Sequence, residues 1–189
     1  MKHAAVLFVS IVALGACNKS PEIHEKNVSV ADVAQKVRDA GVGNGGFLDP
    51  GQWRAVSTLE DVSIPGMTAQ AQAQMKQVMG KASNATFEYC LTPEEARKPS
   101  GKFFGGKDKG NCRYEHFDMS GGKMDAVMRC EGEPPAGTVT MTMNGNYAYD
   151  TYTSHAQMKV DGGREGGMTM SMRTEAKRIG DCTSKTAKG

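Results

Sequence analysis

The chain has 189 residues, of which 39% are hydrophobic, 6% are aromatic and 23 are glycine. The apolar share is low and the glycine share high for a globular protein, which argues against a large helical core and against a polytopic membrane protein. Lys and Arg number 23 against 21 Asp and Glu, and this net charge of +2 gives no electrostatic reason to expect nucleic acid as a partner. The length corresponds to one domain with appendages.

The N-terminus has the pattern of a bacterial lipoprotein signal. Residues 4–14 form an uncharged apolar run, which is shorter than the roughly 20 residues that a bilayer-spanning helix needs. Small residues then precede Cys17, as in a lipobox, where the cysteine thiol receives a diacylglycerol and the signal is cut before it. We therefore expect a lipoprotein signal peptide at 1–16 and lipid attachment at Cys17, in preference to an ordinary secretory signal or a single-pass anchor.

The residue after Cys17 bears on the location. In the sorting rule of enterobacterial lipoproteins an Asp at this position retains the protein at the inner membrane, so Asn18 favours the outer membrane. Several acyl chains on one cysteine make an effectively permanent anchor. We expect a protein of the bacterial cell envelope whose N-terminal lipid anchor holds it to the membrane, facing the periplasm.

Residues 17–46 are expected to form a lipidated tether with one short amphipathic helix. Residues 18–26 are polar. Ser29 and Asp32 have the spacing of a capping box, and the apolar residues that follow recur at helical spacing until Gly41: Val30, Val33, Ala34 and Val37. The glycine-rich segment 41–46 is expected to be a hinge.

Residues 47–183 are expected to form a single antiparallel β-rich domain, and residues 184–189 a disordered tail. Apolar alternation predicts seven strands, with Gly145 among the turns, at 53–64, 86–92, 112–119, 124–131, 137–143, 147–160 and 167–176. In the first of them, one face should carry Trp53, Ala55, Ser57 and Leu59.

Two further helical segments are predicted between these strands. Residues 68–80 carry an apolar stripe at helical spacing, formed by Met67, Ala71, Met75, Val78 and Met79. A single turn should follow Thr92, where a hydroxyl N-cap precedes Pro93 and Glu95. The predicted class is thus α+β but mainly β: a curved antiparallel meander sheet of about six to seven strands, with one or two helices packed on a face and disulfides as staples.

Four cysteines beyond Cys17 form an even set, and disulfides persist in the periplasm. A three-residue loop at 120–122 would place residues whose numbers sum to 242 opposite each other, which pairs Cys112 with Cys130. Cys90 then pairs with Cys182 by elimination. A zinc site built from all four is disfavoured because no two of these cysteines have the close spacing of zinc ligands.

An ordered set of short motifs resembles a known family. The set comprises Pro50–Trp53 at the opening of the first strand, the segment Cys90–Ala96, the cysteines at 112 and 130, and the closing segment Arg178–Cys182. Together they resemble the bacterial exported proteins of domain-of-unknown-function family 3617 (DUF3617). The resemblance covers about residues 50–182, and because the family has no assigned activity, it implies no catalytic residue here.

The residues give little support to an enzyme. After removal of the signal only three histidines remain, His24, His116 and His155, and no H-E-x-x-H or G-x-S-x-G motif occurs. The four cysteines are assigned to disulfides, which leaves no thiol nucleophile. We therefore expect no catalytic residues, no metal site and no cofactor.

Methionine is over-represented, with 13 residues. Eight of them cluster in the predicted sheet between Met124 and Met172, and the alternating runs place five on shared faces: Met141 and Met143, then Met168, Met170 and Met172. Three interpretations are open: a core face under the helices, a soft groove for an apolar ligand, and a Cu(I) site formed by thioethers. The core interpretation is preferred here, with Thr169 and Ser171 toward the solvent side of the sheet.

The expected function is that of a non-enzymatic lipoprotein of the envelope, a binding or envelope-interaction module facing the periplasm. Its expected partners are the membrane, through the anchor, and an apolar ligand or envelope protein. The alternatives are a Cu(I)-binding periplasmic protein that uses the methionine-rich strands, and a small enzyme with an unrecognised site.

Overall fold

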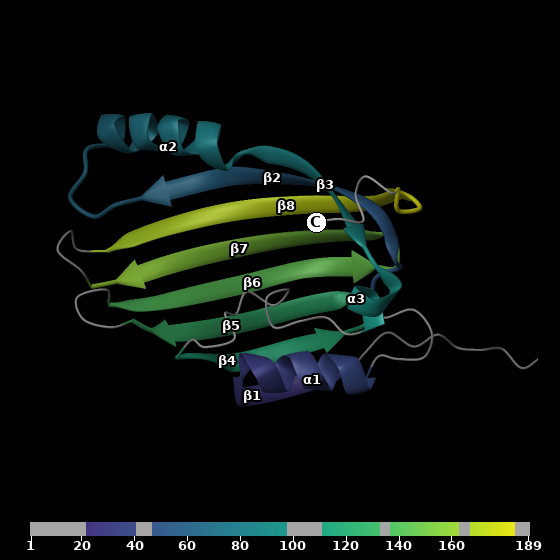
Figure 1. The fold of residues 1–189 in the computed structure, drawn as a ribbon. Helices are drawn as coiled ribbons and strands as arrows, with labels where there is room; N and C mark the ends of the chain where they lie inside the picture. Colours follow the sequence, from purple (N-terminus) through teal and green to yellow (C-terminus); the bar gives the residue numbers. More distant parts are fainter. Residues whose placement is uncertain (1–21, 41–46, 98–110, 133–136, 163–166, 184–189) are drawn as a thin grey trace, which may run out of the picture.

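A computed structural model describes residues 22–40, 47–97, 111–132, 137–162 and 167–183 of the chain. It shows an open antiparallel sheet of eight strands in the order β1-β4-β5-β6-β7-β8-β2-β3 (Figure 1). The strands are β1 (Ile23–Ser29), β2 (Gly51–Ser63), β3 (Ala85–Leu91), β4 (Cys112–Ser120), β5 (Lys123–Glu131), β6 (Thr138–Ala148), β7 (Thr151–Asp161) and β8 (Met168–Gly180). The predicted class, a mainly β antiparallel sheet with two disulfides, is confirmed, but the strand count is higher than the six to seven predicted.

Several sequence predictions fall outside the described residues. These are the signal peptide at 1–16, the lipid-attachment residue Cys17, the hinge at 41–46 and the tail at 184–189.

The additional strand is β1, whose first residues the sequence analysis assigned to the tether. It pairs with β4 at the edge of the sheet, and Ile23 is the buried residue of the strand. Asn27 interrupts the extended chain with a φ of 54°. A strand with one buried side chain and an internal irregularity has almost no period-two hydropathy signal, which explains why the sequence did not predict it.

Helix α1 (Val30–Ala40) forms where predicted and lies across β1 and β4 (Figure 1). The capping box is closed in both directions. The Ser29 hydroxyl donates to Asp32 Oδ2 at 2.7 Å, while the Asp32 backbone N–H donates to Ser29 Oγ at 3.1 Å. The hydrogen bonds that the Ser29 hydroxyl and the Ser29 backbone N–H donate to the Asp32 carboxylate hold the pKa of Asp32 below its usual value. Val33 and Val37 are buried in the same core as Tyr114, so the helix is an integral part of the domain.

Helices α2 (Ala69–Ser83) and α3 (Pro93–Arg97) also form, but the apolar stripe predicted for α2 is not buried against the sheet. Helix α2 lies at the edge of the sheet beside β2, and Gly80 is its only buried residue (Figure 1). Val78, which was expected in its apolar stripe, is 66% exposed. In α3 the Glu95 backbone N–H donates to Thr92 Oγ1 at 3.2 Å, which confirms the predicted cap.

The β4–β5 hairpin has the predicted disulfide but not the predicted turn. Gly121 and Gly122 have φ values of 56° and 76°, as in a two-residue type I′ turn. This turn alone would set a register in which Met119 opposes Met124, so that the numbers of opposed residues sum to 243 and not to the predicted 242. An irregularity between Tyr114 and His116 then shifts the register by one residue, and Cys112 opposes Cys130. The predicted pairing is confirmed, whereas the three-residue loop is wrong.

Gly145 is not a turn residue. It lies inside β6, where it pairs with Met124 of β5 and Ser154 of β7, and the chain turns at 149–150 instead. A Cβ atom built at Gly145 would lie 2.2 Å from the backbone oxygen of Thr153. The glycine is therefore explained by the close approach of two strands.

The two faces of the sheet differ in polarity. One face carries the core, whose largest fully buried side chains on the sheet are Trp53, Tyr114, Phe117, Met119 and Met128. The alternation predicted for β2 is confirmed, since Trp53, Ala55 and Leu59 are all buried. Helix α1 covers this core face only over β1 and β4, so the stretch over β6, β7 and β8 remains partly open.

Candidate ligand-binding site

A pocket of about 440 Å³ lies on the core face, beyond the part that α1 covers. Its floor consists of small residues on three adjacent strands: Gly145, Ser154, Ala156 and Thr174. Small side chains leave the space above the sheet unfilled, and the neighbouring residues along the same strands are large. The side-chain volumes in β6, β7 and β8 therefore set the depth of the pocket.

The two sides of the floor have different chemistry. Toward β4, β5 and β6 the lining residues are Met119, Met124 and Met143, which we call the thioether wall. On β3 the lining residues are Phe87 and Tyr89, which we call the aromatic wall. Tyr147 of β6 and Tyr152 of β7 are cross-strand partners. They border the floor together with Phe47, whose ring contacts that of Tyr147.

The curvature of the sheet brings these walls together. Strands β4 and β3 are six places apart in the sheet order, which in a flat sheet would separate them by about 29 Å at the usual spacing between strands. Residues of both strands nevertheless line one pocket. In Figure 1, β3 bends across the ends of the neighbouring strands toward α3. The approach of these two distant strands is thus what closes the sides of the pocket.

The described lining residues of this pocket carry no ionisable acid or base other than tyrosine. Burial raises the pKa of Tyr89, and the neighbouring Tyr152, which is hydrogen-bonded to it, raises it further. Burial also raises the pKa of Tyr147. The phenols of Tyr89 and Tyr147 therefore stay neutral at physiological pH, and the pocket is a mainly apolar environment.

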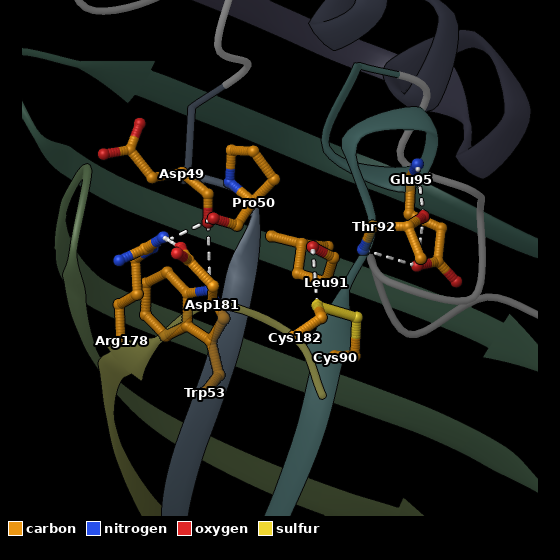
Figure 2. Close-up of a disulfide and its surroundings, with 10 residues drawn as sticks. All are labelled: Asp49, Pro50, Trp53, Cys90, Leu91, Thr92, Glu95, Arg178, Asp181 and Cys182. Carbon is orange, nitrogen blue, oxygen red and sulfur yellow. Dashed lines mark hydrogen bonds and ion pairs between the residues drawn. A yellow bond between two sulfur atoms is a disulfide. The ribbon is translucent and has the colours of Figure 1, made fainter. Parts of the chain in front are cut away.

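The disulfide Cys90–Cys182 holds the aromatic wall in position (Figure 2). Cys90 is adjacent to Tyr89 on β3, and Cys182 follows the end of β8. The predicted pairing is confirmed, with a Cα–Cα distance of 5.4 Å. Because β3 has only β2 as a neighbour in the sheet, this bond adds a second attachment near the wall.

Three of the segments that resemble the family, near Trp53, Cys90 and Arg178, cluster around this bond (Figure 2). Trp53 is fully buried, and its indole N–H donates to the backbone oxygen of Asp49 at 3.0 Å. The Arg178 guanidinium donates to the Pro50 oxygen at 2.9 Å and to Asp181 Oδ1 at 2.6 Å. The Trp53 ring lies 6.0 Å from that of Tyr152. These motifs are structural: they fix the end of the sheet against which the pocket is built.

The five methionines singled out from the sequence share the core face but do not all reach the pocket. Met143 lines it. Met141 and Met143 pack against the core, and like Met168, Met170 and Met172 they are only partly buried. The expectation that the last three would be core residues is therefore wrong. The reason is that α1 covers the opposite end of the sheet order.

The aromatic wall and the small floor residues were not predicted from the sequence. Phe87 and Tyr89 alternate along β3, and Ser154 and Ala156 alternate along β7, so period-two spacing could have placed each pair on one face. No local signal shows that β3 faces β4 and β5 across the curved sheet.

The three histidines lie on the opposite, polar face, each beside a carboxylate. His24 Nδ1 is 2.8 Å from Asp118, His116 Nε2 is 2.7 Å from Asp125, and His155 Nδ1 is 3.2 Å from Glu60. His155 borders a shallow polar depression of about 620 Å³ on that face. None of the three lines the apolar pocket.

The described residues contain neither a candidate metal site nor a membrane-spanning helix. No group of three or more His, Cys, Asp or Glu residues is arranged to hold a metal ion there. Within the same ranges, no helix has the length and apolarity needed to cross a membrane.

Comparison with known proteins identifies a family. The sequence model of the family described as "Protein of unknown function (DUF3617)" matches residues 48–182, which include the pocket floor, both walls of the pocket and all four disulfide cysteines. The chain matches no curated protein and no solved structure. The match begins after α1, so β1 and α1 lie outside the family region.

Proposed function

We propose that this chain, which belongs to the DUF3617 family of proteins of unknown function, is a non-enzymatic envelope lipoprotein that binds a small apolar ligand. The observation that carries the proposal is the pocket, which has the size and apolar lining typical of small-molecule sites. No catalytic role is assigned, because the histidines lie on the other face of the sheet from the pocket.

The location is supported by the sequence alone. The lipobox ending at Cys17 would give the protein a membrane anchor, and two disulfides suit an oxidising compartment such as the periplasm. An anchored protein with an open apolar pocket fits a ligand that is scarce in water and abundant in the envelope.

Native mass spectrometry of the acylated protein, purified from its own membrane, tests the proposal. We expect a bound apolar molecule besides the acyl chains. Ala156→Leu fills the pocket floor and should abolish its retention. Gln157→Leu places the same leucine side chain at an exposed position in the same strand, on the other face, and should retain the ligand. Equal retention in both variants would show that the pocket is not the site.

The anchor is tested separately. Cys17→Ser removes the only thiol in the lipobox, so the variant should remain an unlipidated precursor that takes up no labelled fatty acid. Normal incorporation of the label would contradict the assignment of Cys17.

One observation favours a second candidate, a Cu(I)-binding protein. Four methionines on neighbouring strands oppose one another in register, forming a row across the sheet: Met128, Met141, Met158 and Met170. Thioethers are soft ligands that select Cu(I), and directly paired residues have Cβ atoms about 5 Å apart. Replacement of Met141, Met158 and Met170 by Leu should abolish Cu(I) binding while preserving stability. Undiminished binding in that variant would eliminate this candidate.

A further inference from the structure

The pocket has two walls of different chemistry, and this difference specifies the class of ligand. The inference rests on the proposed binding function and deepens it. The floor fixes the depth of the pocket, the aromatic wall lies on β3, and the thioether wall lies on β4, β5 and β6.

The ligand portion inside the pocket must be uncharged. The described lining residues include no Asp, Glu, Lys, Arg or His, and the phenol groups of Tyr89 and Tyr147 are kept neutral by burial. An ionised group placed here would lose its hydration without gaining a partner of opposite charge, which is strongly unfavourable. A carboxylate, a phosphate or an ammonium group therefore does not belong in this pocket.

The aromatic wall favours a flat ring system. The rings of Phe87 and Tyr89 are 6.1 Å apart and inclined by 32°, so they present neighbouring surfaces toward the pocket. Phe87 is 46% exposed, so part of its ring is free to contact a ligand. Aromatic rings gain from offset stacking beyond the burial of their area, and an acyl chain makes no such contact.

The thioether wall favours the same ligand. Met119, Met124 and Met143 approach the pocket from three adjacent strands. Methionine sulfur makes favourable contacts with aromatic rings, and the unbranched side chain adapts to the outline of a ring system. A ring held between these walls would contact aromatic surface on one side and sulfur on the other.

The volume excludes a very small occupant. At about 440 Å³ the pocket is within the range of sites for drug-sized ligands. A trimethylammonium group, which aromatic cages recognise, would fill only a small part of it.

We propose that the pocket binds an uncharged, planar molecule of two or three fused rings. Phenanthrene serves as the probe because it has no polar group and its fluorescence reports binding directly. The competitor 1-tetradecanol has the same number of carbon atoms in a flexible chain. Tetradecanoate and tetradecyltrimethylammonium add a negative and a positive charge to that chain.

We expect the full-length protein to bind phenanthrene. The three chain compounds, each used below its solubility limit or micelle concentration, should compete with dissociation constants at least tenfold larger than that of phenanthrene. Phe87→Leu keeps the wall apolar but removes the ring, so phenanthrene affinity should fall about two- to tenfold. Binding of 1-tetradecanol should change less than phenanthrene binding. The matched control is Thr86→Leu, an exposed neighbour on the other face of β3, which should leave both affinities unchanged.

The outcomes separate this inference from the proposed function. If the dissociation constant of 1-tetradecanol from competition equals that of phenanthrene from direct titration, the pocket binds chains, and the ring inference is overturned while the binding function stands. Stronger displacement by tetradecyltrimethylammonium would overturn it in favour of an aromatic cage for cations. If no probe binds and no apolar molecule is retained in the native protein, both the inference and the proposed function fail.

Discussion

At the scale of single residues, the absence of side-chain volume is as important as its presence. Gly145, Ser154 and Ala156 leave the space that becomes the pocket, and large side chains such as Tyr147 and Met143 stand at its border. Gly145 has a second role, because the backbone of β7 lies where its side chain would be. One position thus serves both the packing of two strands and the shape of a cavity.

Gly145→Ala should destabilise the fold. Its Cβ would lie 2.2 Å from the Thr153 oxygen, so β6 and β7 must move apart, at a cost of about 1–3 kcal/mol. Gly80→Ala is the matched control, since the nearest atom to its Cβ is 3.6 Å away, in Asn84, and the helix should gain about 0.5–1 kcal/mol. Urea unfolding of both variants measures the two effects, and a destabilisation common to both would contradict this explanation.

At the scale of secondary-structure elements, the position of α1 decides which part of the core face is closed. It covers β1 and β4 and leaves β7 and β8 open, and α2 does not cover that stretch because it lies at the edge beside β2 (Figure 1). The row of methionines across the sheet therefore begins at a buried residue, Met128, and ends at a partly exposed one, Met170.

This gradient predicts different costs for the same substitution. Met128 is 2% exposed, so Met128→Ala should cost about 2–5 kcal/mol, as in other cores. Met170→Ala removes a partly exposed side chain and should cost less than about 2 kcal/mol. The midpoints of urea unfolding, at equal m-values, provide the comparison. Equal losses would mean that Met170 is as well packed as Met128.

The sequence predicted the elements with strong local signals. The capping boxes at Ser29 and Thr92 gave the starts of α1 and α3, and alternation gave seven of the eight strands. The sequence did not predict features that depend on tertiary structure. The register shift near Tyr114 has no composition signal, and the glycine at 145 resembles a turn until the backbone of β7 is placed beside it. The walls of the pocket depend on sheet curvature, which no local pattern specifies.

At the scale of the whole molecule, the sheet is a meander with one long-range insertion. Strands β4 to β8 are joined to their neighbours in chain order, but β2 pairs with β8, the last strand, and carries β3 at the edge. The disulfide Cys90–Cys182 has a sequence separation of 92 and connects this outlying hairpin to the chain beyond β8.

Loss of this disulfide should affect both stability and the pocket. Replacing Cys90 and Cys182 by Ser should cost about 4.5 kcal/mol, against about 3 kcal/mol for the shorter loop of Cys112 and Cys130. The longer bond also holds the aromatic wall, so its removal should increase hydrogen exchange in β3 and weaken ligand binding. Removal of the shorter bond should leave β3 protected. Unchanged exchange in β3 in both variants would contradict a positioning role for the bond.

The two disulfides are nested, since Cys112–Cys130 lies wholly inside the loop closed by Cys90–Cys182. A chain that emerges N-terminus first presents Cys90 and then Cys112, so an oxidant that joins cysteines as they appear makes a non-native bond between them. β2 and β3 also cannot join the sheet until β8 is available to pair with β2. Correct maturation therefore requires either that oxidation wait until Cys130 has emerged and can pair with Cys112, or that a catalyst of disulfide exchange rearrange the first bond.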